Sequence, residues 1–161
     1  MSLSALLSWV EHRPFAIAIA ESTWLFPITE TVHVLALTVV VGAVAMMDLR
    51  LLGVGNKDRP VSDVIASSLP WAWSAFAVAF VAGSMMFCSK AVSYAANLPF
   101  RIKIVCLLLA AANMLLFHLF TARGMVSWDR GPPPLRARLA AGFSLTLWVV
   151  IVATGRWIGF V

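Results

Sequence analysis

Four long apolar stretches run along this chain, and short polar segments with turn-forming residues separate them. Each stretch approaches or exceeds the roughly 20 residues that an α-helix needs to cross the hydrocarbon core of a bilayer. Four spans joined by short connections must alternate in direction. The pattern therefore predicts an all-α fold, an integral membrane four-helix up-and-down bundle, with spans at residues 27–53, 70–89, 99–120 and 137–160.

Proline marks the start of three of these spans. Its fixed φ suits the first helical turn, where the missing N–H costs no hydrogen bond, so we expect Pro27, Pro70 and Pro99 to lie there. Residues 55–60 form a polar connection after the first span. Ser62 is suited to cap a short helix that ends before the second span begins.

The N-terminal segment has a different pattern. Apolar residues recur at i, i+3, i+4 and i+7, which marks one face of a short amphipathic helix: Leu3, Leu6, Leu7 and Val10. We expect this helix to lie in the membrane interface rather than to cross it. The next apolar run, residues 14–20, is too short to span.

The composition excludes an ordinary soluble protein. Hydrophobic side chains make up 61% of the chain and charged ones 12%, and the mean hydropathy is +0.93. Soluble domains average about 25% charged residues. The chain has room for four spans and for no separate soluble domain, so we expect one transmembrane domain over residues 1–161 with the lipid bilayer as its partner.

The basic charge concerns the membrane rather than nucleic acid. The net charge is +5, but Lys and Arg occur singly at span ends and in loops and form no basic face, so we expect no nucleic-acid partner. We name the membrane side where the first span starts side A and the other side B. Side B carries Arg50, Lys57, Arg59, Arg123, Arg130, Arg136 and Arg138. Side A carries Arg13, Lys90, Arg101, Lys103 and Arg156. The positive-inside rule then puts side B in the cytoplasm and both termini in the periplasm of a bacterial inner membrane.

The first span carries an ionisable side chain where hydrocarbon is expected. Between Thr31 and Met47 its only polar side chains are Thr31, Thr38 and His33. Hydrocarbon offers an imidazole no water, so the fold must supply a partner, and such a residue is a functional-site hypothesis by default. Neutral imidazole is also a good ligand for haem iron.

A second histidine, His118, lies late in the third span. The first and third spans run in the same direction, so at 1.5 Å per residue the depths of His33 and His118 differ by roughly 20 Å. One haem cannot bind both, and each histidine needs its own partner.

For His33 the sequence offers thioether and cationic partners on side A. Met85 and Met86 lie at matching depth on the second span, and His12 reaches the same level if the N-terminal segment folds back. Histidine and methionine form a known axial pair for haem iron. Three cations at this level are suited to hold haem propionates: Arg101, Lys103 and Arg156. These residues predict a b-type haem near side A.

Structural alternatives stay open for the same residues. His33 can hydrogen-bond Glu30 or a backbone carbonyl and serve packing alone. Arg156 can snorkel to side A, or it can form a buried ion pair with Glu30 across the bundle.

Side B offers a second candidate site. Met114 and His118 share one helix face at i and i+4, and thioether with imidazole suits copper, above all Cu(I), as well as haem. His118 also lies close enough to the interface to meet only water or headgroups. Three residues of the first span lie at the same depth: Met46, Met47 and Asp48. Asp48 and Arg50 are two positions apart and do not face each other, so each pairs with another span, or Arg50 snorkels.

Short motifs connect these residues to a known family. They are T-V-H-V-L-A-L in the first span, M-D-L-R-L-L-G at its end, F-R-I-K at the start of the third span with Asn113 later, and G-R-W-I-G near the C-terminus. Together they resemble a bacterial family of small four-span membrane proteins of largely unassigned function, and more distantly the four-helix b-type cytochromes and copper-resistance protein D. The resemblance implies a haem or copper membrane protein with His33 and His118 as ligand positions. Two bis-histidine haems need four histidine ligands, and this chain has three histidines.

We therefore expect a membrane haem b protein that transfers electrons or serves as the membrane subunit of a redox partner protein. One alternative is a copper-binding or copper-passing protein, and another is a non-catalytic structural or assembly subunit. Hydrolase, nucleotide and zinc motifs are absent from the sequence, so a binding or electron-transfer role is favoured over an enzyme. Small-residue stripes in the second and fourth spans allow a homo-oligomer and serve packing within one chain equally well.

Overall fold

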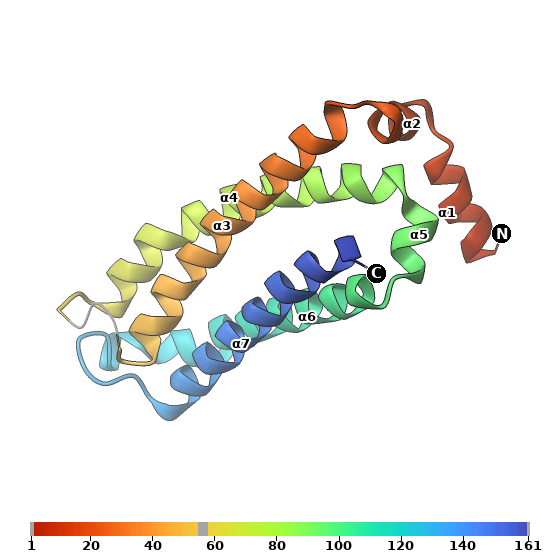
Figure 1. The fold of residues 1–161 in the computed structure, drawn as a ribbon. Coiled ribbons are helices and arrows are strands. Elements are labelled where there is room, and N and C mark those ends of the chain that lie inside the picture. The colour runs from red at the N-terminus through yellow and green to blue at the C-terminus, as the bar shows by residue number, and fades with distance from the viewer. Residues whose placement is uncertain (1, 55–57, 161) are drawn as a thin grey trace.

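The computed structural model describes residues 2–54 and 58–160, and this part of the chain consists of helices joined by short connections, without strands. Residues 55–57 of the predicted polar connection, including Lys57, lie outside the described residues. The helices are α1 (Leu3–Glu11), α2 (Pro14–Glu21), α3 (Leu25–Leu51), α4 (Val61–Ser89), α5 (Ala91–Ala96), α6 (Leu98–Leu116) and α7 (Leu135–Trp157) (Figure 1). A π-helical turn, Phe117–Thr121, and a 3-10 helix, Ala122–Ser127, continue α6, and the 3-10 turn Ile158–Phe160 follows α7.

Four of these helices are long and apolar enough to cross a membrane: α3, α4, α6 with its continuation, and α7 with its last turn. Consecutive spans run in opposite directions (Figure 1). The all-α four-span bundle predicted from the sequence is thereby confirmed. Three of the predicted spans, 27–53, 99–120 and 137–160, agree with the observed helices to within a few residues.

The second span differs from its prediction. α4 is a single helix that contains Pro70 and includes the short helix expected before it, so Pro70 does not begin the span. With 29 residues α4 is roughly 43 Å long, which is enough to cross the hydrocarbon and extend beyond it on side B. The proline removes one N–H without ending the helix, because α4 is anchored on both sides of it by buried residues such as Val64 and Ala72.

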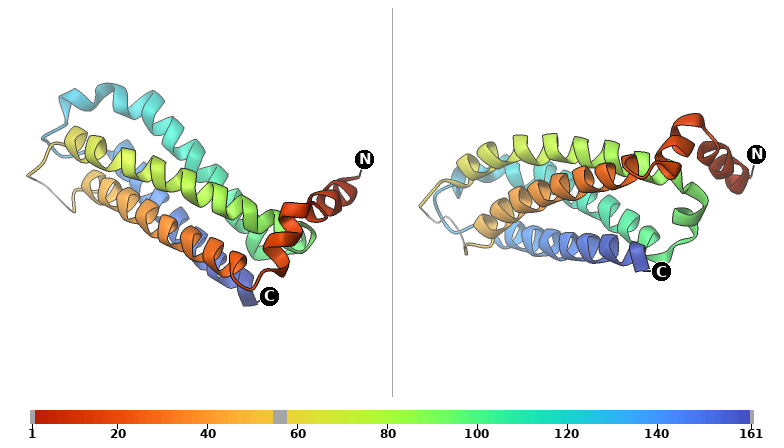
Figure 2. Two further views of the ribbon diagram at one scale, coloured as in Figure 1. Left: turned by 90° about the horizontal axis from the view of Figure 1, so that it is seen from above. Right: turned by 45° about the horizontal axis from the view of Figure 1, so that its top comes forward.

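The spans pack as two pairs, α3 with α4 and α6 with α7, and contact between α3 and α7 joins the pairs (Figures 1 and 2). Small buried residues bring α3 and α4 close together: Ala36, Ala43, Ala72, Ala79 and Ala82. Larger side chains fill the middle of the bundle: Val40, Cys106, Leu147, Trp148 and Ile151. α4 and α6 make little contact, and the two pairs diverge toward α5 (Figure 1).

The N-terminal helices cover side A. α1 forms where the apolar repeat predicts a helix, and none of its residues is buried. It packs beside α5, where a carboxylate oxygen of Glu11 accepts a hydrogen bond from the Val92 backbone N–H at 3.0 Å. α2 buries Ala16 and Ile19 and packs on α4. The N-terminal segment therefore folds against the bundle.

Polar side chains, one of them fully buried, join the helices at side B. Arg50, only 3% exposed, donates from Nε to the Arg59 carbonyl at 2.9 Å and from Nη2 to the Asp129 carbonyl at 3.4 Å. Asp129 precedes α7, and its carboxylate accepts hydrogen bonds from the Ser62 backbone N–H at 2.7 Å and the Ser62 hydroxyl at 2.8 Å. The Val61 N–H donates to the Asp129 carbonyl at 2.9 Å. This side-B clasp, formed by Arg50, Ser62 and Asp129, supplies the N-cap that α4 lacks in its own sequence.

The clasp predicts a stability that depends on pH. The hydrogen bonds from Ser62 hold the pKa of Asp129 below its ordinary value of 3.8. A carboxyl whose pKa is lower in the folded state stabilises the fold above its ordinary pKa, and this contribution disappears as the pH falls through the folded-state pKa. We expect Asp129→Asn to lower the melting temperature by several degrees at neutral pH, with a difference from wild type that shrinks below about pH 4.

Circular dichroism of the protein in detergent measures this difference across the pH range. Asp58→Asn is the matched control, because Asp58 is exposed and makes no such bond within the described residues. Equal effects of the two substitutions would contradict the capping role of Asp129.

Candidate functional site

His33 lies in the third turn of α3 and faces the neighbouring helix α4. Its Nδ1 is 2.7 Å from the backbone carbonyl oxygen of Ala79. A carbonyl can only accept, so Nδ1 carries the proton and Nε2 keeps its lone pair. The sequence leaves two hydrogen-bond acceptors open for His33, the Glu30 carboxylate and a backbone carbonyl. In the structure the acceptor is a backbone carbonyl, and it belongs to a different span.

Gly83 is the reason that the imidazole ring can lie against α4. A Cβ atom at this position would lie 2.9 Å from His33 Cε1 and 3.2 Å from His33 Nδ1. Real Cβ atoms do not approach other atoms so closely, so any side chain at Gly83 would displace the ring. The small-residue stripe of the second span thus has a specific task at this position, which is to accommodate His33.

Lys103 brings a positive charge to the same region from α6. Its side chain packs on Gly155 of α7, where an added Cβ would lie 3.4 Å from Nζ. The charge of Lys103 is close enough to act on His33. Each span thus contributes one residue near side A, in two contacting pairs, and we name His33, Gly83, Lys103 and Gly155 the four-span site.

The charge balance of this site favours an anionic ligand group. Lys103 is partly buried, and within the described residues its ammonium has no hydrogen bond and no carboxylate within 4.0 Å. Glu30 also acts on His33 through its charge, but its own side chain is exposed. An ammonium held away from water needs a counter-charge, and the four-span site itself contains no acidic residue.

The other two predicted cations are engaged elsewhere. Arg101 is exposed and donates from Nε to the Ala95 carbonyl at 2.8 Å. Arg156 is exposed and places its guanidinium carbon 4.8 Å from the centre of the Phe160 ring. The alternative of an ion pair between Arg156 and Glu30 is wrong. The Arg156 guanidinium lies instead against the ring of Phe160, in the 3-10 turn that follows α7. Lys103 is the one of these three cations whose charge acts on His33.

The two candidate methionines differ in orientation. Met85 is 38% exposed. Met86 is partly buried and lies three positions after Gly83 and seven after Ala79, which puts it on the same face of α4. Met86 is therefore the methionine on the side of α4 that meets His33. His12 is exposed at the end of α1, where its Nδ1 donates to the Ser8 carbonyl at 2.7 Å, and no contact within the described residues brings it to His33.

His118 lies at the opposite end of the bundle, in the π-helical turn after α6. It is exposed, and its Nδ1 donates to the Met114 carbonyl of its own helix at 2.9 Å. The structure therefore keeps His33 and His118 apart, as the difference in depth predicts. Among residues 2–54 and 58–160, no group of three or more His, Cys, Asp and Glu side chains is arranged to hold a metal ion.

A family model matches residues 18–161, a region that begins within α2 and contains all four spans and the four-span site. Its description is a family of unknown function, DUF6644. The chain belongs to this family. No curated protein and no solved structure matches this DUF6644 protein.

Three residues of this DUF6644 protein that matter to its sites are difficult to recognise from its sequence. Gly83 and Gly155 look like general packing residues until His33 and Lys103 are seen on them. Asp129 lies 67 positions from Ser62 and looks like a loop residue. The role of Asp129 becomes visible only in the structure, where α4 starts at Val61 without a capping side chain and Arg50 is buried beside the Asp129 carbonyl.

The contact between His33 and Gly83 predicts a large effect of one methyl group. We expect Gly83→Ala to destabilise the protein by about 1–3 kcal/mol, because the methyl group collides with the His33 ring. Gly42→Ala is the matched control within α3, since nothing lies within 4 Å of its Cβ position. There the helix propensity of alanine should stabilise by about 0.5–1 kcal/mol or leave stability unchanged. Reversible unfolding in mixed detergent micelles measures both, and equal effects would contradict the assigned role of Gly83.

Proposed function

We propose that this protein binds one b-type haem at the four-span site, where His33 would hold the iron through Nε2, and acts as an electron-transfer protein or as the membrane subunit of a redox complex. The observation that carries the proposal is the hydrogen bond from His33 Nδ1 to the Ala79 carbonyl. Histidines that bind metals characteristically donate their other ring N–H to a carboxylate or a carbonyl, which fixes the ring and directs the free lone pair.

The surrounding residues suit the edge of a haem. Lys103 offers an unpaired ammonium to a propionate carboxylate, and such charge-assisted hydrogen bonds are among the strong ones. Met86 lies on the His33 side of α4 and is the chain's candidate for a second axial ligand. Gly83 and Gly155 leave room for the His33 ring to lie against α4 and for the Lys103 side chain to lie against α7. A bound haem would supply one-electron chemistry by changing between ferrous and ferric iron, while the chain would fix its orientation and balance its charge.

Copper binding that uses both histidines gains no support from the geometry, because His33 and His118 lie at opposite ends of the bundle. A structural or assembly role remains the main competitor, since the bond from His33 to Ala79 also serves packing. The two roles differ in whether the loss of the imidazole removes a bound cofactor or only lowers stability.

The decisive experiment compares visible spectra of His33→Ala and His118→Ala with the wild type, all purified in mild detergent after expression with added haem precursor. We expect a Soret band and reduced-state α and β bands in the wild type and in His118→Ala, and their loss in His33→Ala. Metal analysis of the same samples distinguishes iron from copper. A wild type without Soret absorbance would end the haem proposal, and a His33→Ala protein that only melts earlier would favour the structural role.

Lys103→Gln tests the same proposal if His33→Ala fails to fold. It keeps the ligand but removes the positive charge that stabilises the reduced, less positive iron. We expect haem to stay bound with a midpoint potential lowered by on the order of 50 mV. An unchanged midpoint potential would show that the charge of Lys103 does not act on the haem.

We also propose that the protein lies in a bacterial inner membrane with side B in the cytoplasm. The excess of Lys and Arg on side B supports this orientation. Alkaline phosphatase fused after residue 161 should be active, since that enzyme folds only in the periplasm, whereas a fusion in the connection before α7 should be inactive. The reverse pattern would invert the orientation.

A further inference from the structure

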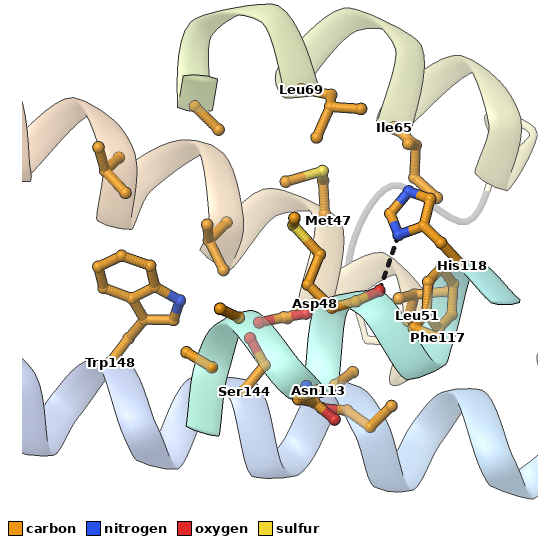
Figure 3. A pocket seen from close by; sticks show the side chains of 18 of the residues that line it. Met47, Asp48, Leu51, Ile65, Leu69, Asn113, Phe117, His118, Ser144 and Trp148 are labelled. Atoms are coloured by element: carbon orange, nitrogen blue, oxygen red, sulfur yellow. Dashed lines mark hydrogen bonds between the residues drawn. The ribbon is translucent and has the colours of Figure 1, made fainter. Parts of the chain in front are cut away.

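A cavity of roughly 190 Å³ lies in the half of the bundle nearer side B, away from the four-span site. Figure 3 shows side chains that line it. All four spans contribute to its wall, which is almost entirely apolar. Its volume exceeds the 150 Å³ or so of an engineered cavity that binds benzene, so it has room for one ring and a few further atoms. The cavity thus has the size of a small ligand rather than of a packing defect.

One buried acid faces this cavity. Asp48 of α3 is only 6% exposed, and its Oδ2 has no hydrogen-bond partner within the described part of the chain. Figure 3 shows its carboxyl group directed into the pocket, with the Ser144 side chain beside it. A buried polar atom without a partner costs free energy, and native structures contain few of them. Oδ2 of Asp48 therefore requires a partner that the described part of the chain does not provide.

The charged neighbours of Asp48 do not neutralise it. Arg50 is directed to the Arg59 and Asp129 carbonyls in the side-B clasp. None of the described residues that line the cavity is a lysine or an arginine. The other titratable group in the wall is His118, whose Nδ1 donates to the Met114 carbonyl, so its Nε2 is left as an acceptor. Oδ2 of Asp48 and Nε2 of His118 thus call for a donor or a cation.

Aromatic rings form much of the remaining wall: Trp73, Phe76, Phe117 and Trp148. The face of an aromatic ring carries partial negative charge and attracts cations, and quaternary ammonium groups are bound in this way by aromatic cages. An acid and several rings around one cavity are complementary to an ammonium group that carries an apolar substituent.

The cavity is accessible from the lipid near the membrane surface. Its exposed wall residues are Trp73 on α4 at 50% and, on α6 and its continuation, Ala111, Met114 and His118, so the mouth lies between two helices that make little contact. α3 ends at Leu51, three residues after Asp48, so the carboxyl lies within one turn of the side-B interface. An amphipathic cation at headgroup level reaches Asp48 without crossing the hydrocarbon.

We propose that this cavity binds a small lipophilic ammonium cation from the bilayer, with the Asp48 carboxylate as its counter-ion and the aromatic rings as its walls. The ligand replaces the missing partner of Asp48, and its apolar part fills the space between the spans. This inference is independent of haem binding, because the cavity and the four-span site occupy opposite halves of the bundle.

The test uses two probes of the same shape, benzyltrimethylammonium and its uncharged isostere neopentylbenzene. Their binding to the full chain in lipid nanodiscs is measured by calorimetry, with empty nanodiscs as the blank for partitioning. We expect saturable binding of the cation and at least about tenfold weaker binding of the neutral isostere. We expect Asp48→Asn to weaken cation binding by about tenfold or more, since it removes the charge and keeps the shape.

Asp63→Asn is the matched control, because Asp63 lies near the same end of the bundle, is exposed and does not line the cavity. It should bind the cation as the wild type does. Asp48→Asn should melt at or above the wild-type temperature, since it removes an unpaired buried carboxylate. Three results would each overturn the proposal: no saturable binding of the cation, equal binding of cation and isostere, or equal cation binding by Asp48→Asn and wild type.

Discussion

Hydrocarbon provides no hydrogen-bond partners, and this constraint decides where the polar side chains of the bundle are directed. Most of them bond to the carbonyl one turn earlier in their own helix: Thr29, Thr31, Thr38, His118, Thr146 and Thr154. In the described spans, His33 and Asn113 reach a neighbouring span instead, His33 the Ala79 carbonyl and Asn113 the Ala140 carbonyl, at 2.7 and 3.0 Å. These bonds join α3 to α4 and α6 to α7, which are the two closely packed pairs.

The same constraint separates the two candidate sites by chemistry. Near side A the surplus group is the ammonium of Lys103, next to a histidine with a free lone pair. Near side B the surplus group is the carboxyl of Asp48, in an aromatic cavity. The bundle therefore carries unpaired groups of opposite sign at its two ends, and each is complementary to a ligand of the other sign. Lys103 and Asp48 cannot neutralise each other, because the packed middle of the bundle separates them.

The sequence predicts much of this fold because, in a bilayer, the length of each apolar segment almost suffices to identify a spanning helix. The four spans and their alternating directions follow from these lengths. Pro27 and Pro99 lie in the first turns of their helices as predicted, whereas Pro70 does not begin a helix because burial on both sides holds α4 together. His33 is recognisable from its position alone. Its acceptor is not, because every residue has a carbonyl and the choice of Ala79 depends on how α4 is rotated. The cap by Asp129 likewise depends on a contact across 67 positions.

The side-B clasp also has a mechanical consequence. Arg50 and Asp129 tie the ends of α3, α4 and the segment before α7 at one membrane surface, whereas the helix pairs spread apart toward the other surface (Figure 1). Because the two helix pairs are joined at one end, a small rotation of one pair there becomes a larger displacement at its other end. His33 lies on α3 of one pair and Lys103 on α6 of the other, so such a rotation changes the distance between them.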